Sequence, residues 1–215
     1  MRIVRVAVVI MCLAVFDREG TAFPTAARIG QLRIVLLVDS SGAVGPHVNQ
    51  FRAGVSAFLD VIPEDQEIAI ISTGGQLRIR VPPTTDRERL RRAVQSFTSD
   101  GGGNAFLDTL LEADKRFLRT APERRPVFVV VTTDSGATSG DVRIDEYNKF
   151  MRDFHQRGGR AHGIVLQGRL NVGATTDILM NLTGNTGGFY DSLVVANALA
   201  DRMKVLAENV AADIF

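Results

Sequence analysis

Two apolar runs that each end on an aspartate constrain the fold most strongly. The runs cover residues 34–38 and 127–131; the first leads directly into Asp39, and the second leads through two threonines into Asp134. Five consecutive, mostly β-branched apolar residues without alternation are typical of a strand buried on both faces, as in a parallel sheet covered by helices. We therefore predict an α/β fold in which both aspartates lie at the carboxyl ends of strands, where open sheets of this kind bind ligands.

The rest of the chain alternates between strand patterns and helix patterns. Segment 77–81 alternates apolar residues with arginine and follows a Gly-Gly turn, which predicts an antiparallel edge strand joined to 67–72 as a hairpin. The whole pattern predicts a doubly wound, mostly parallel six-stranded sheet with one antiparallel edge strand and helices on both faces, a Rossmann-like arrangement. The strands are expected at 34–38, 67–72, 77–81, 126–134, 162–166 and from 187–190 onward. The helices are expected at 46–62, 86–97, 104–119, 144–157, 177–182 and 195–212.

The charge of the chain argues against one class of function. The formal net charge is +1, and no cluster of lysine and arginine is interleaved with aromatic residues. The basic surface of a nucleic-acid-binding protein is therefore missing. The densest basic group comprises Arg87, Arg89, Arg91 and Arg92. Because Asp86 and Glu88 are mixed with these arginines, we interpret the group as a solvated helix face.

No sequence signature of an enzyme accompanies the two aspartates. The chain has neither a glycine-rich phosphate loop followed by Lys-Ser/Thr nor a Gly-x-Ser-x-Gly elbow. Its three histidines, His47, His155 and His162, are expected to be ordinary surface or partly buried residues. We therefore expect no enzymatic activity, with a metal-assisted hydrolase that uses the two aspartates as the alternative.

The N-terminal segment has the pattern of an export signal. Arg2 and Arg5 precede an uncharged stretch at 6–16, which has the length of a signal-peptide core. That stretch is shorter than the roughly 20 residues that a transmembrane helix needs, and a small-residue stretch at 24–27 offers a cleavage site. We predict a signal peptide at 1–27, with an uncleaved membrane anchor or a buried strand as alternatives, and a single domain at 28–215. The protein is then secreted or periplasmic, or anchored in a membrane by this segment.

The only cysteine, Cys12, lies within that segment. The predicted domain therefore contains no thiol, and disulfides, zinc-thiolate sites and cysteine nucleophiles are excluded from it.

Oxygen-bearing side chains gather at the predicted strand ends. Asp39 and Ser41 lie two residues apart on a tight turn, and Asp134 arrives from another strand. Asn104 follows three glycines that let a third loop approach. Because Mg²⁺ prefers oxygen ligands and needs only one or two carboxylates beside hydroxyls and water, these four residues are candidate metal ligands. The alternative is that the aspartates cap the following helices.

An ordered set of segments carries a family resemblance. The segments are 34–42, 98–108, 129–134 and 179–190, and the first strand with its turn is the most specific. Through them the chain resembles the von Willebrand factor type A (vWA) domain across about 32–213, which implies the same six-stranded sheet between helices.

In that family, loops after the first and fourth strands, with a threonine from a loop between them, form a metal-ion-dependent adhesion site. The resemblance implies that Asp39, Ser41 and Asp134 correspond to metal-site residues. Ala43 stands where a second serine is expected, and Asn104 stands where the threonine is expected. The implied site is degenerate, because Ala43 supplies no ligand oxygen, and both a weak Mg²⁺ site and a metal-free site remain open.

The combined expectation is an exported, non-enzymatic protein-binding module. It would engage a protein partner, one that presents an acidic side chain, at the loops around Asp39, Asn104 and Asp134. The alternatives are a metal-free structural or interaction domain and the metal-assisted hydrolase.

Overall fold

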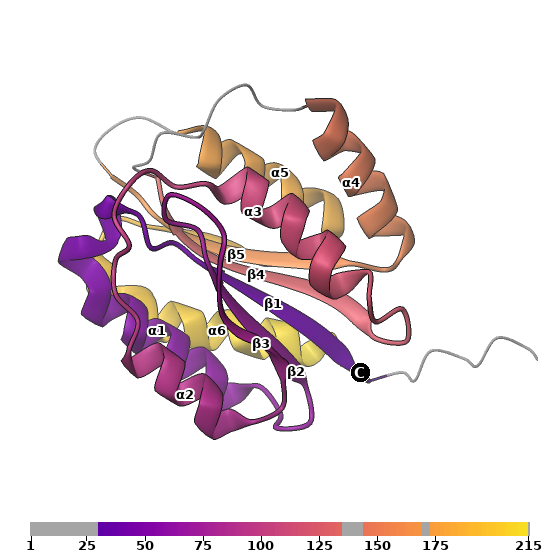
Figure 1. Ribbon diagram of the computed structural model, residues 1–215, viewed down its shortest axis with the longest axis horizontal. Helices are drawn as coiled ribbons and strands as arrows, with labels where there is room; N and C mark the ends of the chain where they lie inside the picture. Colours follow the sequence, from indigo (N-terminus) through magenta and orange to yellow (C-terminus); the bar gives the residue numbers. More distant parts are fainter. Residues whose placement is uncertain (1–29, 135–143, 169–172, 215) are drawn as a thin grey trace, which may run out of the picture.

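The computed structural model describes residues 30–134, 144–168 and 173–214. A six-stranded sheet lies between two layers of helices, with strand order β3-β2-β1-β4-β5-β6 (Figure 1). All neighbouring strands are parallel except the β2–β3 pair, which is antiparallel. This is the predicted fold class. The strands are β1 (Leu32–Val38), β2 (Glu67–Ser72), β3 (Arg78–Thr84), β4 (Arg125–Thr133), β5 (Arg160–Leu166) and β6 (Tyr190–Leu193).

Within the described residues, three helices cover each face of the sheet (Figure 1). One layer contains α1 (Val48–Val61), α2 (Arg87–Gln95) and α6 (Leu199–Ala212), and the other contains α3 (Phe106–Ala113), α4 (Ile144–Gln156) and α5 (Ala174–Thr186). Three short turns join them: η1 (Gly42–His47), the π-helical turn η2 (Asp114–Leu118) and η3 (Ala196–Ala198).

The central strand β1 shows why an uninterrupted apolar run is needed. Leu36 and Val38 pack into the core under α1 and α6, whereas Val35 and Leu37 pack into the core under α3 to α5. Successive side chains of a strand point to opposite faces, so a strand covered on both sides must be apolar at every position. The prediction from residues 34–38 is therefore confirmed.

Several element boundaries differ from the predicted ones. The helix expected at 104–119 begins at Phe106, because Asn104 pairs with Gly74 in an isolated β-bridge, and it continues into η2. Helix α5 is longer than the expected 177–182, and β6 begins at Tyr190 rather than at the Gly-Gly pair. Strand β3 runs through Pro82 and Pro83 to Thr84, which an edge strand tolerates because it has a neighbour on one side only.

The basic group on α2 is solvated only in part. Asp86 caps the helix as expected, since its carboxylate accepts a hydrogen bond from the Arg89 backbone N–H at 2.9 Å. Arg87, however, is buried, and its guanidinium donates to the Ile62 and Pro63 carbonyl oxygens at the end of α1. Burial lowers the pKa of Arg87. The interpretation of all four arginines as a solvated face was wrong for Arg87, because backbone carbonyl oxygens at the end of α1 accept hydrogen bonds from its guanidinium.

The predicted export signal at 1–27, including Cys12, lies outside the described residues. Among the helices of the described ranges, none combines the length and the apolar character needed to cross a membrane.

Candidate functional site

The two aspartates lie at the same edge of the sheet, beyond the carboxyl ends of β1 and β4. The parallel register pairs Val38 with Val131, and the Asp39 backbone N–H donates to the Val131 carbonyl oxygen at 2.9 Å. In Figure 1 this edge is at the left, where β1 ends and the loop before α3 passes. The predicted placement of Asp39 and Asp134 at one edge of the sheet is therefore present.

The Asp39 carboxylate is buried and accepts hydrogen bonds on both oxygens. Its Oδ1 accepts from the Ser41 backbone N–H at 2.8 Å, and its Oδ2 accepts from the Thr133 backbone N–H at 2.9 Å and the Thr133 hydroxyl at 2.5 Å. Three donors thus offset the cost of burying this carboxylate. The side chain fastens the loop after β1 to the end of β4.

Asn104 is buried beside Asp39 and turns its amide nitrogen toward β4. Its Nδ2 donates to the Thr132 hydroxyl at 2.8 Å, while its Oδ1 accepts from the Thr73 hydroxyl at 2.6 Å. The Thr132 hydroxyl lies 3.5 Å from Oδ2 of Asp39. The amide oxygen that was expected to face a cation is therefore engaged with the β2–β3 loop.

Ser41 supplies the one unsatisfied polar group among the candidate residues as the structure describes them. Its side chain is buried and its hydroxyl oxygen has no hydrogen-bond partner. A buried hydroxyl without a partner is unfavourable by about 1–3 kcal/mol. Because this hydroxyl oxygen is itself covered, it can contact a ligand only when the loop moves to expose it.

Asp134 shares the edge, but its described contacts are with α5. Its Oδ1 accepts from the Gly173 backbone N–H at 2.8 Å and from the Thr176 hydroxyl at 2.6 Å. These groups belong to the first turn of α5, so Asp134 acts as a helix-capping carboxylate. Asp134 therefore caps a helix, but that helix is α5 and not the next described helix, α4, as the capping alternative had it. Asp39 binds the neighbouring strand and the turn that follows Asp39 itself.

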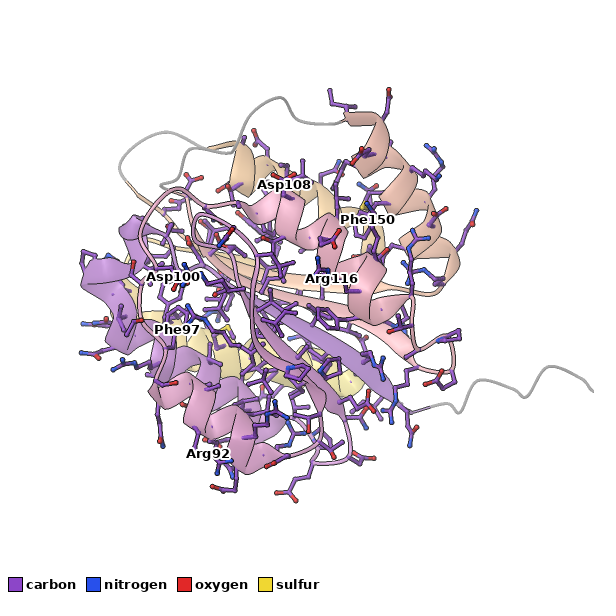
Figure 2. All side chains as sticks on the ribbon, viewed as in Figure 1. Arg92, Phe97, Asp100, Asp108, Arg116 and Phe150 are labelled. Atoms are coloured by element: carbon purple, nitrogen blue, oxygen red, sulfur yellow. The ribbon has the colours of Figure 1, made fainter. Side chains whose placement is uncertain are left out.

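A second buried carboxylate, Asp100, was not singled out by its sequence pattern. Its Oδ2 accepts from the Ser40 hydroxyl at 2.7 Å and from the Arg80 guanidinium, and its Oδ1 accepts from Arg78 at 3.0 Å. Burial opposes ionisation, but the hydrogen bonds from Ser40 and Arg80 hold the pKa of Asp100 below its ordinary value. Figure 2 labels Asp100 among the loops at this edge. The alternating arginines of β3 predict an exposed edge strand, and nothing in their pattern identifies Asp100 as their partner.

Glycines allow the loops to approach one another. The Gly42 N–H donates to the Gly102 carbonyl oxygen at 3.0 Å, as expected for a close approach of the glycine-rich loop. Another close approach is at Gly74, whose N–H donates to the Ser40 hydroxyl at 2.9 Å. A Cβ at residue 74 would lie 2.5 Å from the Ser40 carbonyl oxygen, so only glycine fits there.

The family profile of the von Willebrand factor type A domain matches residues 34–140, about half of the chain, including both strands and both aspartates. The chain belongs to the vWA domain family. A search of curated proteins found no match.

Solved structures share the fold of this vWA domain. The von Willebrand factor type A protein from Catenulispora acidiphila matches with a TM-score of 0.67 and 14% identity, over 86% of this chain and 43% of that chain. Proximal thread matrix protein 1 from the mussel byssus matches with a TM-score of 0.68 and 14% identity, over 85% and 48%. The protein BatB from Bacteroides thetaiotaomicron matches with a TM-score of 0.65 and 10% identity, over 85% and 98%. The chain spans less than half of the first two proteins and nearly all of BatB.

The donor set of this vWA domain fits a bound cation only in part. The Ser41 hydroxyl is free, but both Asp39 oxygens already accept hydrogen bonds, and Asn104 directs its NH₂ group rather than its oxygen toward Thr132. Ala43 has no ligand atom. Within the described ranges, no group of three or more His, Cys, Asp or Glu side chains could hold a metal. Hydrogen bonds from Asp39 and Asn104 hold these loops together.

Proposed function

We propose that this vWA domain is an exported, non-enzymatic protein-binding module that engages its partner at the loops around Asp39, Asn104 and Asp134. Membership of a family of interaction modules supports the class of function. The observation that carries the site is the buried Ser41 hydroxyl, which lacks a partner within the described part of the chain. Loops already fastened by Asp39 and Asp100 lose little conformational freedom when they bind, which favours affinity.

The local charges support a partner that presents an acidic side chain. The Ser41 hydroxyl can donate a hydrogen bond to a carboxylate. The Arg78 side chain, half of it exposed, and the Arg80 side chain lie beside the same loops and share the single carboxylate of Asp100. Although the carboxylates of Asp39, Asp100 and Asp134 outnumber these two arginines, the half-exposed Arg78 side chain can contact an acidic group of a partner.

The binding experiment uses peptides selected by display against the full chain. We expect the selected peptides to be rich in Asp and Glu, and to bind the Ser41→Ala variant about tenfold more weakly, as expected when a hydrogen bond to a charged group is lost. Fluorescence anisotropy of labelled peptides measures the affinity.

Glu208→Ala, an exposed change on α6, is the matched control and should leave the affinity unchanged. Peptides that bind wild type and Ser41→Ala equally, or that show no acidic preference, would place the binding surface elsewhere and contradict the proposal.

The same residues support a weak Mg²⁺ site rather than a tight one. Asp39 and Ser41 can supply oxygens, but Asn104 would have to reverse its amide, and Asp134 would have to leave its contacts with α5. The affinity for Mg²⁺ depends on the number of oxygen ligands, and each of these rearrangements would cost free energy and weaken binding.

Restoring the family pattern should therefore raise the affinity for Mg²⁺. We expect the Ala43→Ser, Asn104→Thr double variant to bind Mg²⁺ at least about tenfold more tightly than wild type, because two hydroxyl oxygens are added. Calorimetric titration measures the affinity, and Asp39→Ala in the same background should abolish the gain. Since Asn104 is buried, Ala43→Ser alone provides a milder variant with a smaller expected gain. If neither variant gains affinity, the interpretation as a degenerate metal site is incorrect.

The contacts of the histidines support the expectation that the chain is not an enzyme. His162 is buried, with one ring nitrogen 3.0 Å from Asp213 and the other accepting from the Phe189 N–H at 3.1 Å. Both ring nitrogens are thus engaged, and within the described residues Ser41 lacks the adjacent base that a serine nucleophile requires.

A further inference from the structure

A cavity of about 330 Å³ lies between α3 with its extension η2 and the facing helix α4. None of its lining residues belongs to the strand-end loops. Its apolar lining comes from Leu111 and Phe150, which belong to the core on this side of the sheet. Figure 1 shows α3 and α4 side by side in one layer, and Figure 2 labels Phe150. The size is near the lower end of the roughly 300–1,000 Å³ that is typical of ligand pockets.

The buried charged side chains beside the cavity form ion pairs with one another. Asp114 is buried at the start of η2, and its two oxygens accept from Arg119 at 2.8 Å and from Arg157 at 2.6 Å. Arg119 also donates to Asp153 at 3.0 Å. The hydrogen bonds that Arg119 donates to Asp114 and Asp153 raise the pKa of Arg119. Two acids and two arginines thus form a closed cluster that joins η2 to α4.

Positive charge remains at the rim of the cavity. Lys115 and Lys149 both line the cavity and are exposed, and neither forms an ion pair within the described part of the chain. Lys149 influences Asp153, but the direct partner of that carboxylate is Arg119. Glu146, the remaining charged residue of the lining, takes part in an interaction of its own.

The turn that presents Lys115 is a π-helical turn, Asp114–Leu118, at the end of α3. Such wide turns occur frequently at functional sites. In this turn Asp114 is buried while the next residue, Lys115, is exposed at the rim, so the Asp114 ion pairs fix the backbone from which the lysine extends.

We propose that this cavity is a second binding site, for an organic anion that joins a carboxylate to an apolar group. The carboxylate lies between Lys115 and Lys149, and the apolar group covers Leu111 and Phe150. The volume limits the occupant to a small group. That chemistry is offered both by a free arylalkyl acid and by the C-terminal residue of a peptide that ends on an apolar side chain.

Phenylpropionate titrated into the full-length protein tests the site. We expect saturable binding that is about tenfold weaker in the Lys115→Gln, Lys149→Gln double variant, because charge-assisted contacts are stronger than neutral ones. The matched control is Lys204→Gln, which removes an exposed lysine from α6 on the other face of the sheet and should bind as wild type does. Calorimetry and backbone-amide chemical shifts report the affinity and the location.

Two further ligands test whether the carboxylate is required and whether the natural ligand is a free acid or a peptide C-terminus. Phenylpropionamide, which lacks the charge, should bind at least about tenfold more weakly than the acid. The peptide Ala-Ala-Phe with a free carboxylate should compete with phenylpropionate, and tighter binding of the peptide or of the free acid identifies the natural source. The proposal is overturned if phenylpropionate does not saturate the protein, if the amide binds equally well, or if the double lysine variant retains wild-type affinity.

Discussion

Replacing Asp39 with alanine should lower the free energy of unfolding by about 4 kcal/mol, because three buried donors lose their acceptor and each orphaned donor costs about 1–3 kcal/mol. These donors are the Ser41 N–H, the Thr133 N–H and the Thr133 hydroxyl. Urea unfolding followed by circular dichroism, with linear extrapolation to zero denaturant, measures the change.

Two control variants separate the hydrogen bonds of Asp39 from its charge and from surface effects. Asp39→Asn keeps one acceptor oxygen and should lose less stability than Asp39→Ala. Glu208→Ala removes an exposed carboxylate from α6 and should change stability by less than about 0.5 kcal/mol. A loss below about 1 kcal/mol for Asp39→Ala would contradict the assigned hydrogen bonds.

Replacing Asp100 with alanine should lower the free energy of unfolding by about 3 kcal/mol. The change leaves the partly buried Arg80 guanidinium without its acid and frees the Ser40 hydroxyl, and removing one partner of a buried ion pair costs about 3–5 kcal/mol. Arg80 keeps its hydrogen bond to the Ser72 hydroxyl at 2.9 Å, so we expect a loss at the lower end of that range. The same urea experiment measures it.

The pH dependence of Asp100 has a defined sign. Despite burial, the hydrogen bonds from Ser40 and Arg80 hold its pKa below the ordinary value of 3.8, so the unfolded chain binds more protons than the native state under acid conditions. The stability from this carboxylate is therefore complete above the ordinary pKa and is lost as the pH falls through the lowered one. The difference between wild type and Asp100→Asn should be full at neutral pH and shrink below about pH 4. A difference that stays constant down to the acid transition would exclude this ion pair as its cause.

The fold could be predicted from sequence because its strongest signals are local. An uninterrupted apolar run such as 34–38 must be covered on both faces, and the edge strand at β3 is revealed by its alternating arginines. The predicted boundaries of helices were wrong where contacts with distant segments outweigh the local sequence pattern. Asn104 leaves the expected helix because Gly74 and Thr73 bind it from a loop about thirty residues away.

The sequence could predict where the candidate site lies, but not which hydrogen bonds its side chains form. Asp39 and Asp134 each follow a parallel strand, and this position in the sequence predicts that both lie at one edge of the sheet. The direction in which a side chain points depends on distant donors: Thr133 binds Asp39, whereas Thr176 binds Asp134. Neither Asp100 as the partner of Arg78 and Arg80 nor the burial of Arg87 could be deduced, because each partner comes from a separate segment.

The two prolines of β3 affect how this molecule associates with others. Proline has no N–H, and the N–H groups of consecutive strand residues point to opposite sides, so Pro82 and Pro83 together withhold one donor from any chain that adds alongside β3. At the opposite border of the sheet, β6 offers only four residues. Both borders are therefore poor templates for the addition of further strands, which favours recognition of another protein through side chains.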